Sequence, residues 1–278
     1  MPKVHKTAIV DEQVILADDV EIGPYCILSG PITLGAGVKL ISMVHLQGPL
    51  TVGAGTVFYT HSTIGFGPQD AKVNPGDPTA GVVIGKDCIF RENTTVHCAS
   101  NTDKPTRIGD RAFFMVNAHA GHDVTVGDDV ILVVDVGLGG FSEIQDRVIL
   151  SGGTMVHQFG RVGRQAMTSG MTALTNDLPP YFLAVERNIV VGLNLVGMRR
   201  SGMSREEIEA VRSAYSEVFR KHPPMNELRE MLAERAKNSK AVDDIYQFIL
   251  TSKRAICPVG GRKVTRAVEV PARVDAGV

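Results

Sequence analysis

The sequence predicts a left-handed parallel β-helix of hexapeptide repeats, followed by a small α-helical C-terminal domain. Three observations predict this fold: an apolar residue at every sixth position, a glycine that often follows it, and a change to a helical period near the C-terminus. A period of six fits neither the 3.6 residues of a helical turn nor the alternation of an ordinary strand. In a parallel β-helix each hexad supplies one short strand and one corner, and three hexads, about 18 residues, make one triangular coil.

The first block of hexads starts near the N-terminus and is unbroken. We expect the residue at every sixth position to point into a narrow core, and the glycine after it to form a corner, since glycine has no Cβ to clash in a tight turn. The sixth-position residues of this block are Val4, Val10, Leu16, Ile22, Leu28, Leu34, Leu40, Leu46, Val52, Phe58 and Ile64.

The second block resumes in a new phase at Ile84 and runs to Leu174. Two gaps interrupt the repeat, at residues 66–82 and 98–106, and both are rich in Pro, Gly, Asp and Asn, as loops are. Insertions in a solenoid lie at its corners and often on its binding face. We therefore expect these two loops to border the functional site.

After Leu174 a Pro-rich segment, NDLPPYFLAVERN, leads out of the repeat. From Ser204 the period becomes helical, and Ser204 with Glu207 forms a predicted capping box in which Glu207 reaches back to the helix start. The prolines at 223–224 end this helix, and further helices are expected at 226–237 and 241–254. The predicted domains are a β-helix over 1–190, a helical domain over 191–257 that caps its open end, and a flexible tail over 258–278.

Composition excludes several classes of function. The chain has 278 residues and a net charge of −1, which gives no general affinity for nucleic acid or an anionic membrane. The N-terminus lacks the apolar segment of a secretory signal, and no stretch is long enough to cross a bilayer. The four cysteines, Cys26, Cys88, Cys98 and Cys257, have no metal-binding spacing. We expect a cytoplasmic protein without membrane insertion.

Three histidines of the second block, His119, His122 and His157, are candidates for chemistry. Asp123 follows His122, and a carboxylate there can fix the imidazole tautomer for a general base that takes a proton from an alcohol. Two alternatives remain open from spacing alone. The histidines can be corner residues bonded to a neighbouring coil, or the His-x-x-His pair can contribute to a zinc site.

Two further segments suggest ligand contacts. Gly139 and Gly140 would leave backbone N–H groups open to stabilise an oxyanion, although local sequence alone favours a tight corner. Arg199 and Arg200, with Arg205 nearby, are suited to a diphosphate or an acidic carrier protein, or to a solvated face.

Several segments, taken in order, resemble the bacterial UDP-N-acetylglucosamine O-acyltransferase family, within the hexapeptide-repeat acyltransferase superfamily. They cover almost the whole chain, and the two that contain histidine pairs or His-Gln-Phe are the most specific. The segments are QDAK at 69–72, VH at 96–97, NAHAGHD at 117–123, VHQF at 156–159, DLPPY at 177–181 and GLN…GMRRSG at 192–202.

The resemblance implies a homotrimeric enzyme without cofactor or metal. It would move a 3-hydroxyacyl group from acyl carrier protein to the sugar 3-hydroxyl of UDP-N-acetylglucosamine, the first step of lipid A synthesis. It implies that His122 is the general base, that Asp123 orients it and that the Gly140 N–H is the oxyanion donor. A small residue at Gly170 would favour a longer acyl chain. The implied substrate contacts are Asp70, Lys72, His97, His119, His157, Gln158, Gly170, Asn194 and Arg200.

Three positions depart from the family pattern: Phe141 replaces a histidine, Val196 a glutamate and Ser201 a basic residue. Phe141 cannot donate a hydrogen bond to a sugar or phosphate. Two alternatives therefore stay open: an N-acyltransferase that acts on a UDP-amino sugar, and a non-catalytic β-helix that binds acyl carrier protein or a nucleotide sugar.

Overall fold

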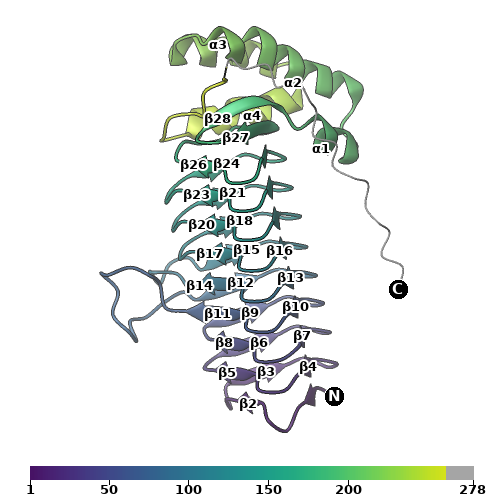
Figure 1. The fold of residues 1–278 in the computed structure, drawn as a ribbon, viewed down its shortest axis with the longest axis vertical. Helices are drawn as coiled ribbons and strands as arrows, with labels where there is room; N and C mark the ends of the chain where they lie inside the picture. The colour runs from purple at the N-terminus through teal and green to yellow at the C-terminus, as the bar shows by residue number, and fades with distance from the viewer. Residues whose placement is uncertain (261–278) are drawn as a thin grey trace.

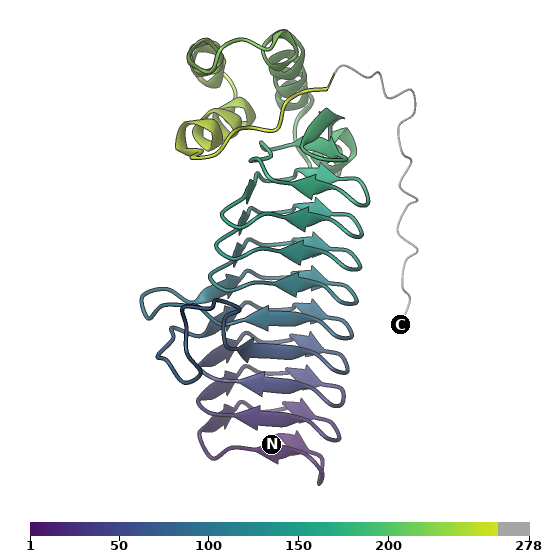
Figure 2. The same cartoon turned by 60° about the vertical axis from the view of Figure 1, so that its left-hand side comes forward.

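The computed structural model describes residues 1–260. Within them, short strands wind through three parallel sheets and form a tall β-helix with helices at its C-terminal end (Figure 1). Turned by 60°, the same coils are seen stacked one on another, with the helices above them (Figure 2). The predicted β-helix followed by helices is confirmed.

Up to β26 each sheet collects every third strand of the chain, and β27 and β28 extend the first sheet. The first sheet holds β1 (Lys3–Val4), β4 (Glu21–Ile22), β7 (Lys39–Leu40), β10 (Val57–Phe58), β13 (Ile89–Phe90), β16 (Phe113–Phe114), β19 (Ile131–Leu132), β22 (Ile149–Leu150), β25 (Met167–Thr168), β27 (Phe182–Val185) and β28 (Ile189–Leu193). The second holds β2 (Ile9–Val10), β5 (Ile27–Ser29), β8 (His45–Gln47), β11 (Thr63–Phe66), β14 (Thr95–His97), β17 (His119–Ala120), β20 (Gly137–Leu138), β23 (Met155–Val156) and β26 (Ala173–Leu174). The third holds β3 (Val14–Leu16), β6 (Ile32–Leu34), β9 (Leu50–Val52), β12 (Val82–Ile84), β15 (Thr106–Ile108), β18 (Thr125–Val126), β21 (Glu143–Ile144) and β24 (Arg161–Val162).

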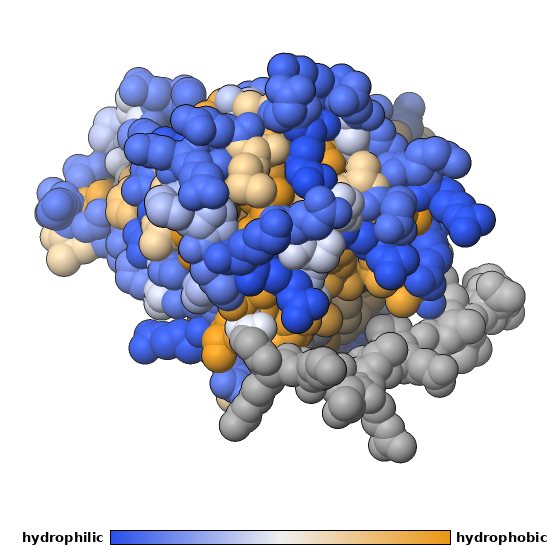
Figure 3. Space-filling view, turned by 90° about the horizontal axis from the view of Figure 1, so that it is seen from above, coloured by the Kyte–Doolittle hydropathy of each residue, from blue (hydrophilic) through white to orange (hydrophobic). Residues whose placement is uncertain are grey.

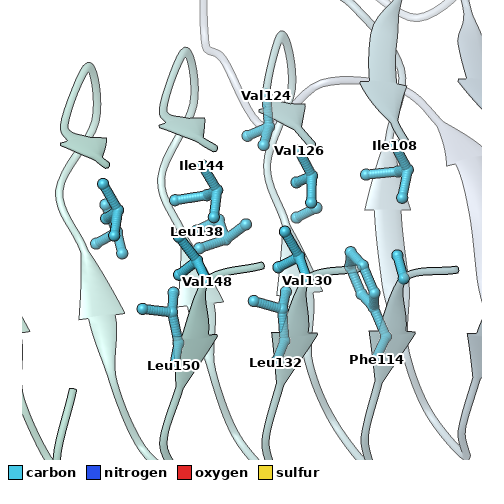
Figure 4. Close-up of a cluster of buried hydrophobic side chains, with 14 of the residues drawn as sticks. Ile108, Phe114, Val124, Val126, Val130, Leu132, Leu138, Ile144, Val148 and Leu150 are labelled. Atoms are coloured by element: carbon cyan, nitrogen blue, oxygen red, sulfur yellow. The ribbon is translucent and has the colours of Figure 1, made fainter. Parts of the chain in front are cut away.

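The residues at the sixth positions form the core, as predicted. Leu132 pairs with Leu150 in the next coil, and Val126 pairs with Ile144, so that like residues stack along the axis (Figure 4). Val4 is the exception and is largely exposed, because β1 belongs to the first coil at the open N-terminal end. Most hexads also bury the residue two positions before the sixth, such as Ile32 before Leu34 and Val130 before Leu132, and the core is mostly aliphatic.

Both predicted loops leave the β-helix on the same side, where they project from its flank (Figure 2). They are also bonded to each other: the backbone N–H of Ala80 donates to the carbonyl of Asn101 at 2.7 Å, and the Thr79 hydroxyl donates to the carbonyl of Ala99 at 2.6 Å. The two insertions therefore form one structure beside the second sheet.

The C-terminal region contains α1 (Leu195–Arg200), α2 (Arg205–Glu217), a 3₁₀ turn (Phe219–Lys221), α3 (Met225–Ala236) and α4 (Lys240–Thr251). Ser204 caps α2 by accepting from the Glu207 N–H at 3.2 Å, as predicted. Glu207 does not reach back to its own helix start. Its carboxylate instead accepts from the Ser239 hydroxyl at 2.6 Å and the Ala241 N–H at 2.8 Å, because the start of α4 offers unpaired donors.

The exit segment contains structure that the sequence did not predict. β27 and β28 form an antiparallel hairpin on top of the last coil, and α1 follows it. The predicted domain boundary at residue 190 falls inside β28. Residues 258–260 also pair with β28, since Val190 exchanges backbone hydrogen bonds with Pro258 and Gly260. The rest of the predicted tail, 261–278, lies outside the described residues.

Viewed from the helical end, this surface is mostly hydrophilic, with hydrophobic residues visible between the charged ones (Figure 3). Cys26, Cys88, Cys98 and Cys257 are all buried as free thiols. Over residues 1–260, no helix has both the length and the apolar character needed to cross a bilayer.

Candidate active site

A pocket of about 610 Å³ lies on the outer face of the second sheet, under the 66–82 loop. Its floor comes from β14, β17, β20 and β23, and one wall comes from the corners that follow these strands. The lining residues are Gln69, Asp70, Ala71, Lys72, His97, His119, Gly121, His122, Gly137, Leu138, Gly139, Gly140, Met155, Val156 and Gln158. Seven of the twelve predicted site residues meet here: Asp70, Lys72, His97, His119, His122, Gly140 and Gln158.

His122 and Asp123 form a buried pair at the corner after β17. The Nδ1 atom of His122 lies 2.7 Å from Oδ2 of Asp123. The same carboxylate accepts from the Ser100 N–H at 3.1 Å and from Nδ2 of Asn101 at 2.6 Å. The 98–106 loop therefore holds Asp123, and Asp123 in turn holds the imidazole. With Nδ1 occupied in this way, Nε2 is the ring nitrogen left to exchange a proton with a ligand.

Gly140 occupies the equivalent corner in the next coil. Its backbone N–H has no acceptor within residues 1–260, whereas the N–H of Gly139 beside it donates to the carbonyl of Val156 at 2.9 Å. A Cβ added to Gly140 would lie 2.7 Å from Nε2 of His122. A basic nitrogen and a free amide donor thus border the same small space, which is the arrangement required to stabilise an oxyanion beside a general base.

His97 and His119 line the pocket next to this pair. Their rings meet edge to face with centroids 5.2 Å apart, and Nδ1 of His119 lies 2.7 Å from the Thr95 hydroxyl of the preceding coil. Burial, together with the charges of His97 and His122, lowers the pKa of His119 to about 4; burial also lowers the pKa of His97. Both imidazoles are therefore neutral near pH 7.

His119 lies within β17 and not at a corner, but its bond to Thr95 joins it to the neighbouring coil, as one alternative expected. It also lines the pocket. Asp70 and Lys72 come from the 66–82 loop, where the carboxylate of Asp70 accepts from the Lys72 N–H at 3.0 Å.

In the part of the chain that the structure describes, no three His, Cys, Asp or Glu side chains are grouped to hold a metal ion.

The other predicted contact residues lie outside the pocket lining. His157 is exposed, with Nδ1 bonded to the carbonyl of Gln158 at 2.8 Å. Gly170 lies at the opposite corner of the second sheet, where an added Cβ would meet only the carbonyl oxygen of Gly152 at 3.5 Å. Arg200 is exposed on α1. The roles predicted for these residues stay predictions.

Both polar atoms of the Asn194 side chain are hydrogen-bonded within its own chain. Its Oδ1 accepts from the Gly197 N–H at 2.9 Å and caps α1, while its Nδ2 donates to the carbonyl of Gln165 at 2.9 Å. The side chain is only 7% exposed in total. The sequence does not predict this cap, because it does not predict α1.

Aromatic packing at the His122 corner is a further feature of the site. The Phe141 ring meets His122 edge to face with centroids 5.2 Å apart, and stacks on Phe159 of the next coil at 4.9 Å. The two phenylalanines are 38% and 52% exposed. Phe141 and Phe159 are 18 residues apart in the sequence, the length of one coil, and this spacing accounts for their stacking.

Comparison with known proteins gives consistent results. Residues 177–257 match the family model described as UDP-N-acetylglucosamine O-acyltransferase, domain 2. An acyl-[acyl-carrier-protein]–UDP-N-acetylglucosamine O-acyltransferase of Aliarcobacter butzleri is 35% identical over 258 residues, which cover 92% of this chain and 98% of the relative. The chain belongs to this family. The namesake enzyme of Sulfurovum is 38% identical, with the same two coverages.

Solved structures of the family agree with the fold. The UDP-N-acetylglucosamine acyltransferase of Francisella novicida superposes with a TM-score of 0.89 at 32% identity, covering 96% of this chain and all of that one. The enzyme of Campylobacter jejuni gives 0.86 at 33% identity, covering 93% and 100%. The predicted family membership is thereby confirmed, and the chain is an acyltransferase of this family.

Proposed function

We propose that this protein transfers a 3-hydroxyacyl group from acyl carrier protein to the 3-hydroxyl of UDP-N-acetylglucosamine, the first step of lipid A synthesis. The observation that carries the proposal is the pairing of His122 Nε2 with the unbonded N–H of Gly140 across one small space. The names of the relatives supply the substrate classes. We also propose that the enzyme acts in the cytoplasm, as expected from its sequence.

The proposed reaction has two proton transfers. Nε2 of His122 takes the proton of the sugar hydroxyl as its oxygen attacks the thioester carbonyl, and the Asp123 carboxylate stabilises the imidazolium through the 2.7 Å contact to Nδ1. The Gly140 N–H donates to the oxyanion of the tetrahedral intermediate. The intermediate then expels the thiolate of the carrier protein, which takes the proton from His122. The products are the sugar ester and free carrier thiol.

We assign the polar end of the pocket to the nucleotide sugar. Asp70 and Lys72 offer a carboxylate and an ammonium from the loop, and His97 and His119 offer neutral imidazoles that accept or donate hydrogen bonds. Gln158 adds an amide from the C-terminal side.

We further propose a homotrimer, in which a second copy brings its own surfaces to each pocket. The outer face of the first sheet supports this. From β10 onward its outward positions are apolar in every coil, whereas the outward positions of the third sheet are mostly polar. The apolar positions are Val57, Ile89, Phe113, Ile131, Ile149, Met167 and Leu183. A continuous apolar face of this kind is typical of an interface between subunits.

A trimer would also account for His157, Gly170 and Arg200, which this chain does not bring into its own pocket, whereas the Asn194 amide is bonded within its own chain. Sedimentation equilibrium measures the mass directly: we expect three times the chain mass for the wild type and a smaller species for Ile131→Asp. A wild-type mass of one chain would contradict the trimer.

The deciding assay for the reaction measures purified protein with 3-hydroxyacyl carrier proteins of several lengths and UDP-N-acetylglucosamine. We expect product from the wild type and none from a folded His122→Ala variant. Normal turnover by that variant would end the proposal for the mechanism.

Phe141 favours one alternative, a 3-amino sugar as the acceptor, because its ring places an apolar surface beside His122. The same assay with UDP-sugar bearing a 3-amino group tests it: product only from the amino sugar would make the enzyme an N-acyltransferase. Binding of the carrier protein without product from either sugar would indicate a non-catalytic protein.

A further inference from the structure

The backbone conformation at Gly137 does not require a glycine. Gly137 lies within β20, and its φ is outside the left-handed region that favours glycine. Glycine weakens a strand interior and often marks a place where another group approaches closely. Here a Cβ would meet only one residue, Met155, with Sδ at 2.5 Å and Cε at 3.4 Å. The absent side chain leaves room for a thioether.

Met155 is the register partner of Gly137 in the next coil, and its side chain lies back across the glycine. It lines the pocket and is 53% exposed. Leu138 and Val156 also line the pocket, but they are buried members of the core. Within the described residues, Met155 is therefore the one long, exposed apolar side chain of the pocket lining.

Its position relative to the reacting groups is defined by the coils. Gly137 and Gly140 belong to the same coil, and Met155 lies one coil further toward the C-terminus. Asp70, Lys72, His97 and His119 all come from earlier coils or their loop. An acyl chain whose carbonyl oxygen lies at the Gly140 N–H would thus have these four polar residues on its N-terminal side, with Met155 and the amide of Gln158 on the other.

We infer that Met155, lying across Gly137, is a specificity-determining residue for the acyl donor, in contact with the carbons nearest the thioester. This inference rests on the proposed acyl transfer. Methionine suits the task because its unbranched, polarizable side chain adapts to an irregular apolar surface. Because Gly137 has no side chain, the thioether of Met155 has room to change its position over β20.

Kinetics on the full chain test this inference. We would measure kcat/KM for 3-hydroxyacyl carrier proteins of increasing length, and the KM for UDP-N-acetylglucosamine, in the wild type, Met155→Ala and Met155→Leu. Met155→Ala is expected to lower kcat/KM for the preferred donor about tenfold, the lower end of what one lost methylene contact costs. It should also flatten the length preference and leave the sugar KM unchanged. Met155→Leu, of similar volume, should restore most of the loss.

Met225→Ala is the matched control, because Met225 is 40% exposed at the start of α3 and does not line the pocket. Its length profile should be that of the wild type, and thermal unfolding should show all variants folded. An unchanged profile in Met155→Ala, or a change confined to the sugar KM, would overturn the inference while the proposed function stands. A wild type that transfers no acyl group would overturn both.

Discussion

The imidazole of His122 occupies the space into which a side chain on Gly140 would project. A Cβ at Gly140 would lie 2.7 Å from Nε2 and 2.8 Å from Cε1 of the ring. The N–H of Phe141 donates to the carbonyl of His122 at 3.0 Å, which fixes the two corners against each other. Since neither the ring, held by Asp123, nor the corner can easily move, glycine at 140 is required by the position of His122.

Gly140→Ala should therefore inactivate the enzyme without unfolding it. The added methyl pushes the His122 ring out of position or moves the Gly140 N–H. We therefore expect kcat to fall about 10²- to 10³-fold, as when an oxyanion donor is lost. Turnover assays with circular dichroism measure both effects. Gly192→Ala is the control, because a Cβ there meets no atom within 4 Å. A Gly140→Ala enzyme with wild-type kcat would refute the assignment.

Asp123→Asn should also reduce kcat, by about 10²- to 10⁴-fold, because the neutral amide no longer stabilises the imidazolium of His122. The N–H of Ser100 and the amide of Asn101 can still find an acceptor there, so the loop should remain in place.

Asp135→Asn provides a matched control for this variant. Asp135 has the same left-handed corner conformation, with φ of 61° against 60° for Asp123, but is exposed and accepts only from Asn117 at 2.9 Å. If both variants lost kcat equally, the loss would come from a disturbed corner conformation and not from the contact between Asp123 and His122.

The hexapeptide repeat makes much of the β-helix and of its site predictable from the sequence. Because every coil repeats the same path, the position of a residue in its hexad fixes its direction and its neighbours one coil away. Phe58, Phe90 and Phe114 fall at sixth positions and indeed stack in the core, with centroids 4.9 Å apart in each pair. The meeting of His119, His122 and Gly140 follows from the same regularity.

The features that sequence reasoning missed involve contacts without a period. Glu207 bonds to the start of α4, and Tyr181 bonds to Asp244, across long stretches of chain that carry no common pattern. The side chain of Asn194 caps α1, which the sequence does not predict because a helix of six residues is too short to show a helical period. Such contacts depend on how the β27–β28 hairpin and the helices pack against the last coil. The nucleotide contact of Asn194 stays a prediction.

His119 should make stability depend on pH. Its pKa is about 4 in the folded protein, mainly because of burial, and about 6.5 in an unfolded chain. Both states are neutral above pH 6.5. Between pH 6.5 and 4 the unfolded chain binds a proton that the folded one does not, so stability falls as pH falls, by at most about 3 kcal/mol.

His119→Gln should reduce this slope, because glutamine does not titrate and can still bond to Thr95. Thermal unfolding from pH 7 to pH 4.5 measures it, with His5→Gln, at an exposed site near the N-terminus, as the control. The same slope in wild type and His119→Gln would show that His119 is not the source.

The junction between the β-helix and the helices depends on a buried hydroxyl. The Tyr181 side chain is almost fully buried after the last coil, and its O–H donates to Oδ2 of Asp244 on α4 at 2.8 Å. Burial alone would raise the pKa of Asp244, but hydrogen bonds from Lys240 and Tyr181 and the charge of Arg164 lower it overall. The carboxylate is thus charged near pH 7 and depends on these donors.

Tyr181→Phe should destabilise this junction by about 1–2 kcal/mol, because it removes one donor from a partly buried charged acceptor. Thermal unfolding followed by the helical signal measures the change. Tyr215→Phe is the matched control: Tyr215 packs edge to face on Phe182 nearby, and its hydroxyl bonds to no group within residues 1–260. If the two variants unfold together at the wild-type temperature, the Tyr181–Asp244 bond does not hold α4 to the last coil, and the contacts of α4 with Arg161 and Arg164 must hold it instead.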